Sequence, residues 1–320
     1  MWKFSFYNTS FDFLRWRKLA MAWSLLVLLI AIVSLLSQGM NLGLDFTGGT
    51  MIAVQYPYTV EIPKIREILS KCGIRNAQAQ HFGTSRDILI RIPPQKSSQL
   101  DNASLGKRIL QTLQSDKDSG GDGATLRQVE FVGPQVGQEL VEQGSLAAFG
   151  AMVCILIYIM FRFEWRLAIG TIAATIHDVL FTIGFFSLLH IEFNLTVLAA
   201  VLAVIGYSVN DTVVVLDRIR ENFRKRCKYS TVEVMNLSIN ETLSRTIITS
   251  FVTLLSVIVL YLFGGNAMRG FAIAMICGIV VGTYSSIYIA SATALYFNVS
   301  RENLLHLNLH SNRGDAVDRY

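Results

Sequence analysis

Charged residues are scarce in this chain. Lys, Arg, Asp and Glu together make up 16% of its 320 residues, whereas in soluble globular domains they make up roughly a quarter. Hydrophobic residues account for 52%, and the mean hydropathy is +0.44. The composition therefore predicts a polytopic α-helical membrane protein that lies in the lipid bilayer.

The sequence also lacks the motifs of several large enzyme classes. It contains no GxxxxGKS or GxxxxGKT phosphate loop, no nucleophile elbow and no HExxH pair. Its four cysteines have neither disulfide nor metal-ligand spacing. The pI near 9.0 comes without an arginine-rich patch interleaved with aromatics, so no nucleic-acid partner is expected. We expect no enzyme, no catalytic residue, no metal and no cofactor, and an ion gradient as the energy source.

The sequence does contain six apolar runs of about the length that a helix needs to cross a bilayer, roughly 20 residues. The first, 19–37, follows a basic and aromatic segment at 1–18; a signal peptide would have a shorter run and a small-residue cleavage site. The other five lie within 141–300, and a polar tail follows at 301–320. These five runs are 145–161, 167–189, 195–216, 246–263 and 268–297.

Basic residues are distributed unevenly between the loops. Arg162 and Arg166 flank one short loop, and the long loop 217–245 is rich in Lys and Arg. The two loops on the opposite side contain neither. The positive-inside rule then places the basic loops and both termini in the cytoplasm, and residues 38–140 outside.

Residues 38–140 form the only large polar segment, and their pattern is that of a small α+β domain. Strands are expected at 51–56, 77–82, 87–92 and 126–132, and helices at 63–72 and 105–113, with an exposed linker at 115–123. The order β-α-β-β-α-β is that of a split βαβ, ferredoxin-like sandwich.

The long basic loop has a helix signal of its own. Ser230 and Glu233 fit a capping box, and apolar residues from Val232 to Leu243 recur on one helical face. We expect a short amphipathic helix that lies on the membrane surface, packs against a partner, or simply connects spans four and five.

Ionisable residues interrupt three of the spans, and such groups are rare in membranes outside ion or proton pathways. His177 and Asp178 lie in the third span, Asn210 and Asp211 in the fourth, and Arg245 opens the fifth. A carboxylate whose pKa changes as a cation approaches or withdraws can load and release a proton. These five residues are therefore the predicted proton relay.

Each of these positions also has a structural interpretation. Asp211 would lie at the membrane edge, Arg245 would be a positively charged flank, and His177 with Asp178 would be a static hydrogen-bonded contact between helices. Gly278 and Gly282 have the small-xxx-small spacing that allows close helix packing and needs no further function.

Four motifs, in order along the chain, resemble one family. Residues 42–50, LGLDFTGGT, resemble the signature of the SecD and SecF protein-export membrane proteins; its characteristic residues here are Asp45, Phe46, Gly48 and Gly49. The segments GYSVNDT at 206–212, HDVLF at 177–181 and GTYSSI at 282–287 resemble the SecF-type members. Leu216 departs from the pattern, where Phe is usual.

The resemblance implies a relative of the RND transporter superfamily with six spans and one external domain. It implies SecD as partner and work beside the SecYEG translocon in the bacterial inner membrane. The proton motive force would help to draw exported, unfolded polypeptides across at a late stage. The resemblance also assigns proton passage to the positions of Asp211 and Arg245.

Two other functions remain open from the sequence. One is half of an RND-type small-molecule exporter, which would require a large apolar pocket. The other is an assembly subunit that stabilises the translocon without moving protons, in which Asp211 would tolerate replacement. The coupling ion is open as well, because Asn210, Asp211 and Thr212 could supply oxygens to sodium.

Overall fold

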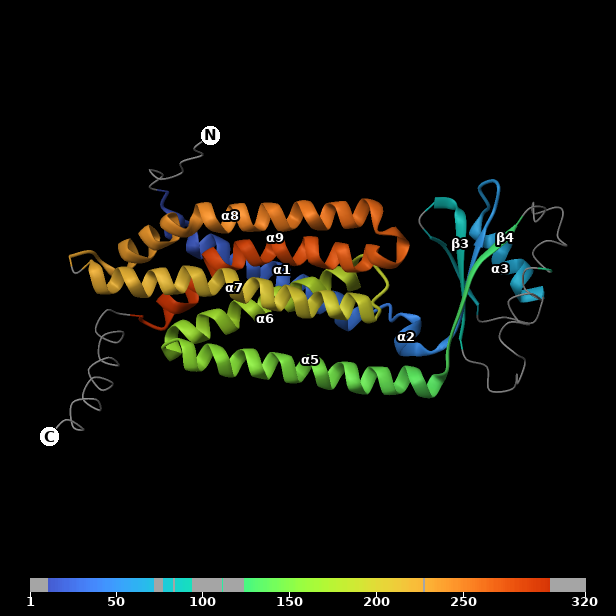
Figure 1. Ribbon diagram of the computed structural model, residues 1–320, viewed down its shortest axis with the longest axis horizontal. Coiled ribbons are helices and arrows are strands. Elements are labelled where there is room, and N and C mark those ends of the chain that lie inside the picture. Colours follow the sequence, from blue (N-terminus) through green and yellow to red (C-terminus); the bar gives the residue numbers. More distant parts are fainter. Residues whose placement is uncertain are drawn as a thin grey trace. The chain divides into compact units, whose positions relative to one another are not determined.

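The structure is a computed structural model that describes residues 11–71, 77–82, 84–93, 111, 124–226 and 228–299 (Figure 1). The chain divides into two compact units. The helical unit comprises Met1–Asn41, Ala148–Ile191 and Thr196–Tyr320, and the sheet unit comprises Leu42–Ala147 and Glu192–Leu195. Residues 1–10, the predicted helix 105–113 apart from residue 111, the linker 115–123 and the tail 301–320 lie outside the described residues.

Six helices of the described chain are long and apolar enough to cross a membrane, as predicted. A short 3-10 helix, η1(Phe13–Trp16), leads into the first of them. The six are α1(Arg17–Ser37), α5(Pro134–Arg162), α6(Trp165–Leu188), α7(Leu195–Lys225), α8(Thr231–Phe263) and α9(Gly265–Tyr296). Helices satisfy their own backbone hydrogen bonds, which a lipid environment requires.

The six helices differ in how deeply they are buried. In the most apolar 18-residue window, 61% of residues are buried in α6, 50% in α7 and 56% in α9, but only 6% in α5. Glycines allow the close approach at the centre: a Cβ at Gly278 of α9 would collide with Val204 of α7, as the small-residue spacing predicted. The centre of the helical unit is therefore α6, α7 and α9.

The segment predicted as the loop 217–245 is different in the structure. It is helical over 217–225 and 231–245, because α7 continues to Lys225 and α8 begins at Thr231. The predicted capping box is present at Ser230 and Glu233, but the helix that it starts is continuous with the fifth span. An apolar run indicates only the part of a helix that can lie in the bilayer, and the same helix can continue beyond it with polar residues. For the same reason α5 starts at Pro134, before the expected boundary at 141.

The sheet unit contains one four-stranded sheet with the order β2-β3-β1-β4. Its described elements are α2(Leu44–Thr47), β1(Gly49–Gln55), α3(Ile62–Lys71), β2(Gln78–Phe82), β3(Thr84–Ile92) and β4(Thr125–Val132). All neighbouring strands are antiparallel. β1 and β2 therefore run parallel with β3 between them, which is the predicted split βαβ arrangement.

Alternation along the strands builds the core of this unit. Ile52 and Val54 of β1 and Ile88 and Ile90 of β3 are buried together with Ile65 of α3. Successive strand residues point to opposite faces, so one face of the sheet packs against α3. The predicted strands and first helix are confirmed with small shifts at their ends.

Candidate functional site

Asp178 of α6 is fully buried and joins three helices. Its Oδ2 accepts hydrogen bonds of 2.5 Å from Ser208 Oγ of α7 and 2.7 Å from Ser285 Oγ of α9. Its Oδ1 lies 3.1 Å from Nδ1 of the neighbouring His177. We call Asp178, His177, Ser208 and Ser285 the inner cluster. Burying a carboxylate is unfavourable unless donors surround it, and the two hydroxyls supply that compensation.

Gly282 makes room for the inner cluster. A Cβ at this position would lie 3.3 Å from the Ser208 Cβ and 3.6 Å from Asp178 Oδ2. A larger side chain would therefore separate α9 from the carboxylate. Ser285 is three residues further along and reaches it from the same helix.

Asp211 of α7 lies in a second, separate polar cluster and is 3% exposed. Ser250 Oγ of α8 is 3.5 Å from Asp211 Oδ2, at the long limit of a hydrogen bond, and 2.8 Å from Thr283 Oγ1 of α9. The Tyr207 hydroxyl donates to Ser250 Oγ at 3.2 Å. We call Asp211, Ser250, Thr283 and Tyr207 the outer cluster. Its carboxylate is held much more loosely than that of Asp178.

The two clusters share helices. Ser208 and Asp211 are three residues apart on α7, and Thr283 and Ser285 are two residues apart on α9. A displacement of α7 or α9 therefore changes both clusters, because each helix supplies a side chain to each.

The structure brings Arg245 into the surroundings of Asp211 but leaves Asn210 apart. The Arg245 side chain is exposed and lies within electrostatic reach of Asp211; among the described residues it forms no ion pair within 4.0 Å. Asn210 is exposed, and no hydrogen bond from its side chain to Asp211 is found in the described chain. His177 and Asp178 belong to the inner cluster, and within the described chain no hydrogen bond joins either of them to Asp211.

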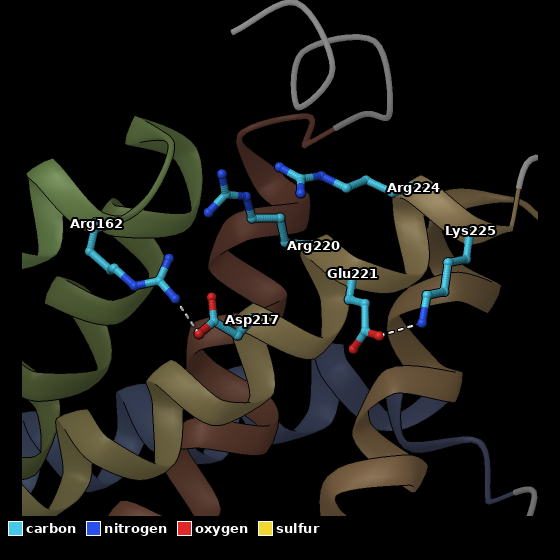
Figure 2. Close-up of a pocket in the computed structure, with 6 residues that line it drawn as sticks. All are labelled: Arg162, Asp217, Arg220, Glu221, Arg224 and Lys225. Atoms are coloured by element: carbon cyan, nitrogen blue, oxygen red, sulfur yellow. Dashed lines mark hydrogen bonds and ion pairs between the residues drawn. The ribbon is translucent and has the colours of Figure 1, made fainter. Parts of the chain in front are cut away.

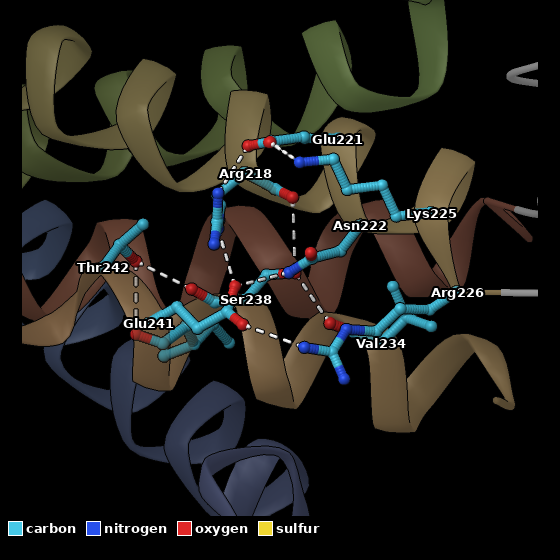
Figure 3. A network of polar contacts seen from close by, with 10 residues as sticks. Arg218, Glu221, Asn222, Lys225, Arg226, Val234, Ser238, Glu241 and Thr242 are labelled. Carbon is cyan, nitrogen blue, oxygen red and sulfur yellow. Dashed lines mark hydrogen bonds and ion pairs between the residues drawn. The ribbon is translucent and has the colours of Figure 1, made fainter. Parts of the chain in front are cut away.

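A polar pocket of about 380 Å³ opens beside Arg245, between α7 and α8. It is lined by Val214, Asp217, Arg218, Glu221, Glu241, Thr242 and Arg245. Figure 3 shows the polar network at its wall, in which Arg218 pairs with Glu241 at 2.6 Å and with Glu221 at 2.5 Å. Val214 is one helical turn from Asp211, so the pocket ends close to that carboxylate.

Sequence reasoning missed the hydroxyls of Ser208, Ser250, Thr283 and Ser285. Short hydroxyl side chains occur in many apolar helices, where they also bond to their own backbone, so a single sequence does not distinguish those that face a carboxylate. In the described residues, no group of three His, Cys, Asp or Glu side chains is placed to hold a metal ion.

The signature residues 42–50 have structural roles in the sheet unit. Asp45 Oδ2 accepts the backbone N–H of Leu195 at 2.9 Å, and Phe46 stacks on Phe193 with ring centroids 6.0 Å apart. Gly49 has a φ of +123°, and a Cβ there would collide with the Ile92 carbonyl; Gly48 has a φ of 67°. Such backbone conformations favour glycine.

An ion pair lies beside this signature. Arg91 Nη2 is 2.5 Å from Glu192 Oε1, and Arg91 Nη1 donates to the Leu42 carbonyl at 2.9 Å. Burial raises the pKa of Glu192, and Arg91 opposes that shift. The segment 192–195 is thus fixed to the signature by backbone, aromatic and charged contacts.

Comparisons with known proteins agree with these features. The chain matches the family described as "Protein export membrane protein SecD/SecF, C-terminal" over residues 112–300 and the "SecD/SecF GG Motif" over residues 33–56. Protein translocase subunit SecF of Vibrio alginolyticus is 46% identical over 293 residues, covering 92% of this chain and 91% of the relative. The SecF subunit of Escherichia coli O157:H7 is 44% identical over 305 residues, covering 95% and 93%.

Solved structures of SecDF are also similar. The crystal structure of SecDF from Thermus thermophilus, a translocon-associated membrane protein, has a TM-score of 0.81 at 35% identity and covers 93% of this chain. SecDF in its super-membrane-facing form has a TM-score of 0.67 at 33% identity and covers 99% of this chain. This chain spans 40% and 41% of the length of those SecDF chains. With its motifs, its six membrane-spanning helices and its split βαβ sheet, the chain belongs to the SecD/SecF family of protein export membrane proteins, as a SecF-type member.

Proposed function

We propose that this chain forms, with SecD, a unit that uses the proton motive force to assist a late stage of protein translocation through SecYEG. The observation that carries the proposal is the outer cluster. Asp211 is a buried carboxylate in an apolar helix; the Ser250 hydroxyl lies at the long limit of a hydrogen bond, the Thr249 hydroxyl is nearby, and a cation is within reach without forming an ion pair in the described chain. A group held so loosely can change its protonation state without breaking a tight network.

In this mechanism Asp211 carries the proton and Arg245 is its switching counter-charge. Approach of the guanidinium favours the ionised carboxylate, and withdrawal favours the protonated one. The exposed position of Arg245 at the rim of the polar pocket leaves its long side chain room for both positions. The pocket offers protons a path to within a helical turn of Asp211.

The proton is favoured over sodium as the coupling ion. A sodium site would need several oxygens that converge on Asp211. Asn210 is exposed and Thr212 Oγ1 donates to the Ser208 carbonyl at 3.0 Å, so neither of these side chains is directed at that carboxylate.

The pairing with SecD is supported by a face of α7. Ala199, Ala203, Gly206 and Asn210 are exposed and recur at helical spacing, which places them along one side of the helix. Small residues on a membrane helix allow another helix to approach closely, and a polar side chain among them favours a protein neighbour over lipid. The similar SecDF chains are more than twice as long as this one.

The orientation follows from the distribution of the basic residues. We call the end of the helical unit that carries Arg162, Arg166 and the α7–α8 connection the basic end, and we place it and both termini in the cytoplasm. The sheet unit is then external, in the space that exported polypeptides enter, and protonation of Asp211 would be coupled to its movement.

Export of a secreted reporter in cells that carry Asp211→Asn tests the proposal. Asn keeps the size of the side chain but does not titrate, so export should fall to the level of a deletion while the variant stays in the membrane and bound to SecD. Glu164→Gln, which removes a carboxylate paired with Arg166 at the basic end, should retain export. Normal export by Asp211→Asn would exclude proton coupling at this residue and favour the assembly role.

A further inference from the structure

A second pocket of about 380 Å³ lies at the basic end, between α5 and α7. It is lined by four cations and two carboxylates: Arg162, Arg220, Arg224, Lys225, Asp217 and Glu221 (Figure 2). Proton transfer at Asp211, as proposed above, does not use this pocket. The lining carries more cations than carboxylates, and part of its positive charge is therefore not balanced by the residues of the pocket.

The two carboxylates already have partners. Arg162 pairs with Asp217 at 2.6 Å, and Lys225 pairs with Glu221 at 2.5 Å. Arg220 and Arg224 form no ion pair or hydrogen bond through their side chains within the described chain. Asp217 lies within electrostatic range of Arg220, but it is paired with Arg162, so neither guanidinium has an anion bound to it in the described chain.

These two groups are also close enough to repel each other. Arg220 is partly buried and lies within electrostatic range of both Arg224 and Arg162. Figure 2 shows the side chains of Arg220 and Arg224 extending into the same space. An anion between them would relieve the repulsion and satisfy several N–H donors at once, and the planar guanidinium fits the oxygens of a phosphate.

The position of the pocket indicates where that phosphate comes from. Arg162 is the last residue of α5, and Tyr158 and Phe161 on the preceding turn are exposed. Because α5 buries so little of its surface within the chain, lipid chains can lie along it. Basic pockets between membrane helices at the bilayer surface are typical sites for anionic lipid headgroups.

We propose that Arg220 and Arg224, with Arg162 at the pocket wall, bind the phosphate of an anionic phospholipid whose acyl chains lie against the exposed side of α5. The lipid bridges α5, which packs loosely, to α7, which carries Asp211. A headgroup of phosphatidylglycerol supplies the required net negative charge, and the zwitterionic phosphatidylcholine does not.

Native mass spectrometry of the full-length chain in detergent, titrated with phosphatidylglycerol or phosphatidylcholine, tests this proposal. The wild type should retain phosphatidylglycerol in preference to phosphatidylcholine. Arg220→Gln/Arg224→Gln should weaken phosphatidylglycerol binding about tenfold or more, as expected for loss of charge-assisted hydrogen bonds. Arg220→Lys/Arg224→Lys should keep part of the affinity, which distinguishes loss of the anion site from misfolding.

A matched control removes the same charge from the same end of the molecule. Arg226 and Lys228 do not line the pocket, so Arg226→Gln/Lys228→Gln should retain the lipid. Equal loss in both double variants would show only general attraction to positive charge and would overturn the proposal. Displacement of the lipid by inorganic phosphate at about 1 mM, the affinity of a weak small-anion site, would overturn its assignment to a lipid.

Discussion

The hydroxyl of Ser208 in α7 donates a 2.5 Å hydrogen bond to the carboxylate of Asp178 in α6. Ser285 of α9 donates to the same oxygen, so one buried carboxylate holds together the three most buried helices of the protein. Hydrogen bonds to an ionised acceptor are shorter and stronger than neutral ones. This arrangement favours the structural interpretation of Asp178, whereas Asp211 has the loose surroundings that a change of protonation requires.

Asp178→Asn should therefore reduce stability more than function. The substitution removes the charge from the hydrogen bonds of Ser208 and Ser285, and we expect the free energy of unfolding to fall by about 1–3 kcal/mol. Thermal unfolding of the purified variant and export of a reporter, normalised to the amount of variant in the membrane, measure the two effects. If export per molecule fell as far as in Asp211→Asn, Asp178 would belong to the proton pathway instead.

Ser285→Ala and Ser291→Ala form a matched pair on α9. Both serines are fully buried, but Ser285 donates to Asp178, whereas the hydroxyl of Ser291 finds no hydrogen-bond partner among the described residues. Ser285→Ala should destabilise the protein by about 1–2 kcal/mol, and Ser291→Ala should be neutral or stabilising. Equal melting temperatures of the two variants would contradict the assignment of the inner cluster.

Gly278→Ala and Gly206→Ala test the two sides of α7. Gly278 belongs to α9 and faces the inner side of α7, and Gly206 lies on the exposed side of α7 itself. A methyl group at Gly278 would collide with Val204, so this variant should lose about 1–3 kcal/mol through overpacking. Val204→Ala should restore part of that loss. Outside its own helix, no atom of the described residues lies within 4 Å of a Cβ at Gly206, so Gly206→Ala should leave the stability of the isolated chain unchanged or raise it slightly.

The same two glycines should rank in the opposite order when the loss of SecD binding, and not the loss of stability, is measured by co-purification. The exposed face of α7 that includes Gly206 is the proposed SecD contact, so Gly206→Ala should reduce recovery of SecD more than the doubly substituted Gly278→Ala/Val204→Ala protein does. Full recovery of SecD with Gly206→Ala would move the contact to another helix.

Arg91→Gln should make the stability of the sheet unit dependent on pH. Burial already raises the pKa of Glu192, and loss of Arg91 removes the cation that opposes this shift. A raised pKa means that the folded state disfavours the carboxylate, so stability falls as the pH rises above the carboxyl's ordinary value. At neutral pH we expect a loss of up to about 3 kcal/mol, the low end for buried pairs, since both side chains keep some exposure.

Thermal unfolding of Arg91→Gln and wild type between about pH 5 and pH 8 measures this dependence. The difference in melting temperature between the two proteins should be largest near pH 8, and it should become smaller at lower pH as Glu192 becomes protonated. Arg127→Gln on β4 is the control, because Arg127 bonds to Gln55 and, among the described residues, to no carboxylate. A difference that does not vary with pH would show that Arg91 acts mainly through its bond to Leu42.

Several features could be predicted from the sequence because they depend on local pattern. The apolar runs predict the six spans, alternation predicts the strands, and Ser230 with Glu233 predicts the start of α8. The limits of α5 and α7 were less predictable. An apolar run marks only the part of a helix that lies in lipid, whereas both helices continue into water as polar sequence. The position of Asn210 depends on which face of α7 packs inward, and hydropathy does not resolve this for a small polar residue.

The sequence by itself determined that this is a six-span membrane protein of the SecD/SecF family, because composition, length of apolar runs and contiguous motifs are local properties. Only the tertiary structure decided which polar groups meet. In the sequence, Asp178 and Asp211 have equivalent surroundings, because each is a single carboxylate in an apolar helix. Packing gives Asp178 two short hydrogen bonds from serines on other helices, whereas Asp211 has only the hydroxyls of α8 at long range and a cation at a distance. That difference arises from contacts between residues up to 107 positions apart, and so it is absent from any local pattern.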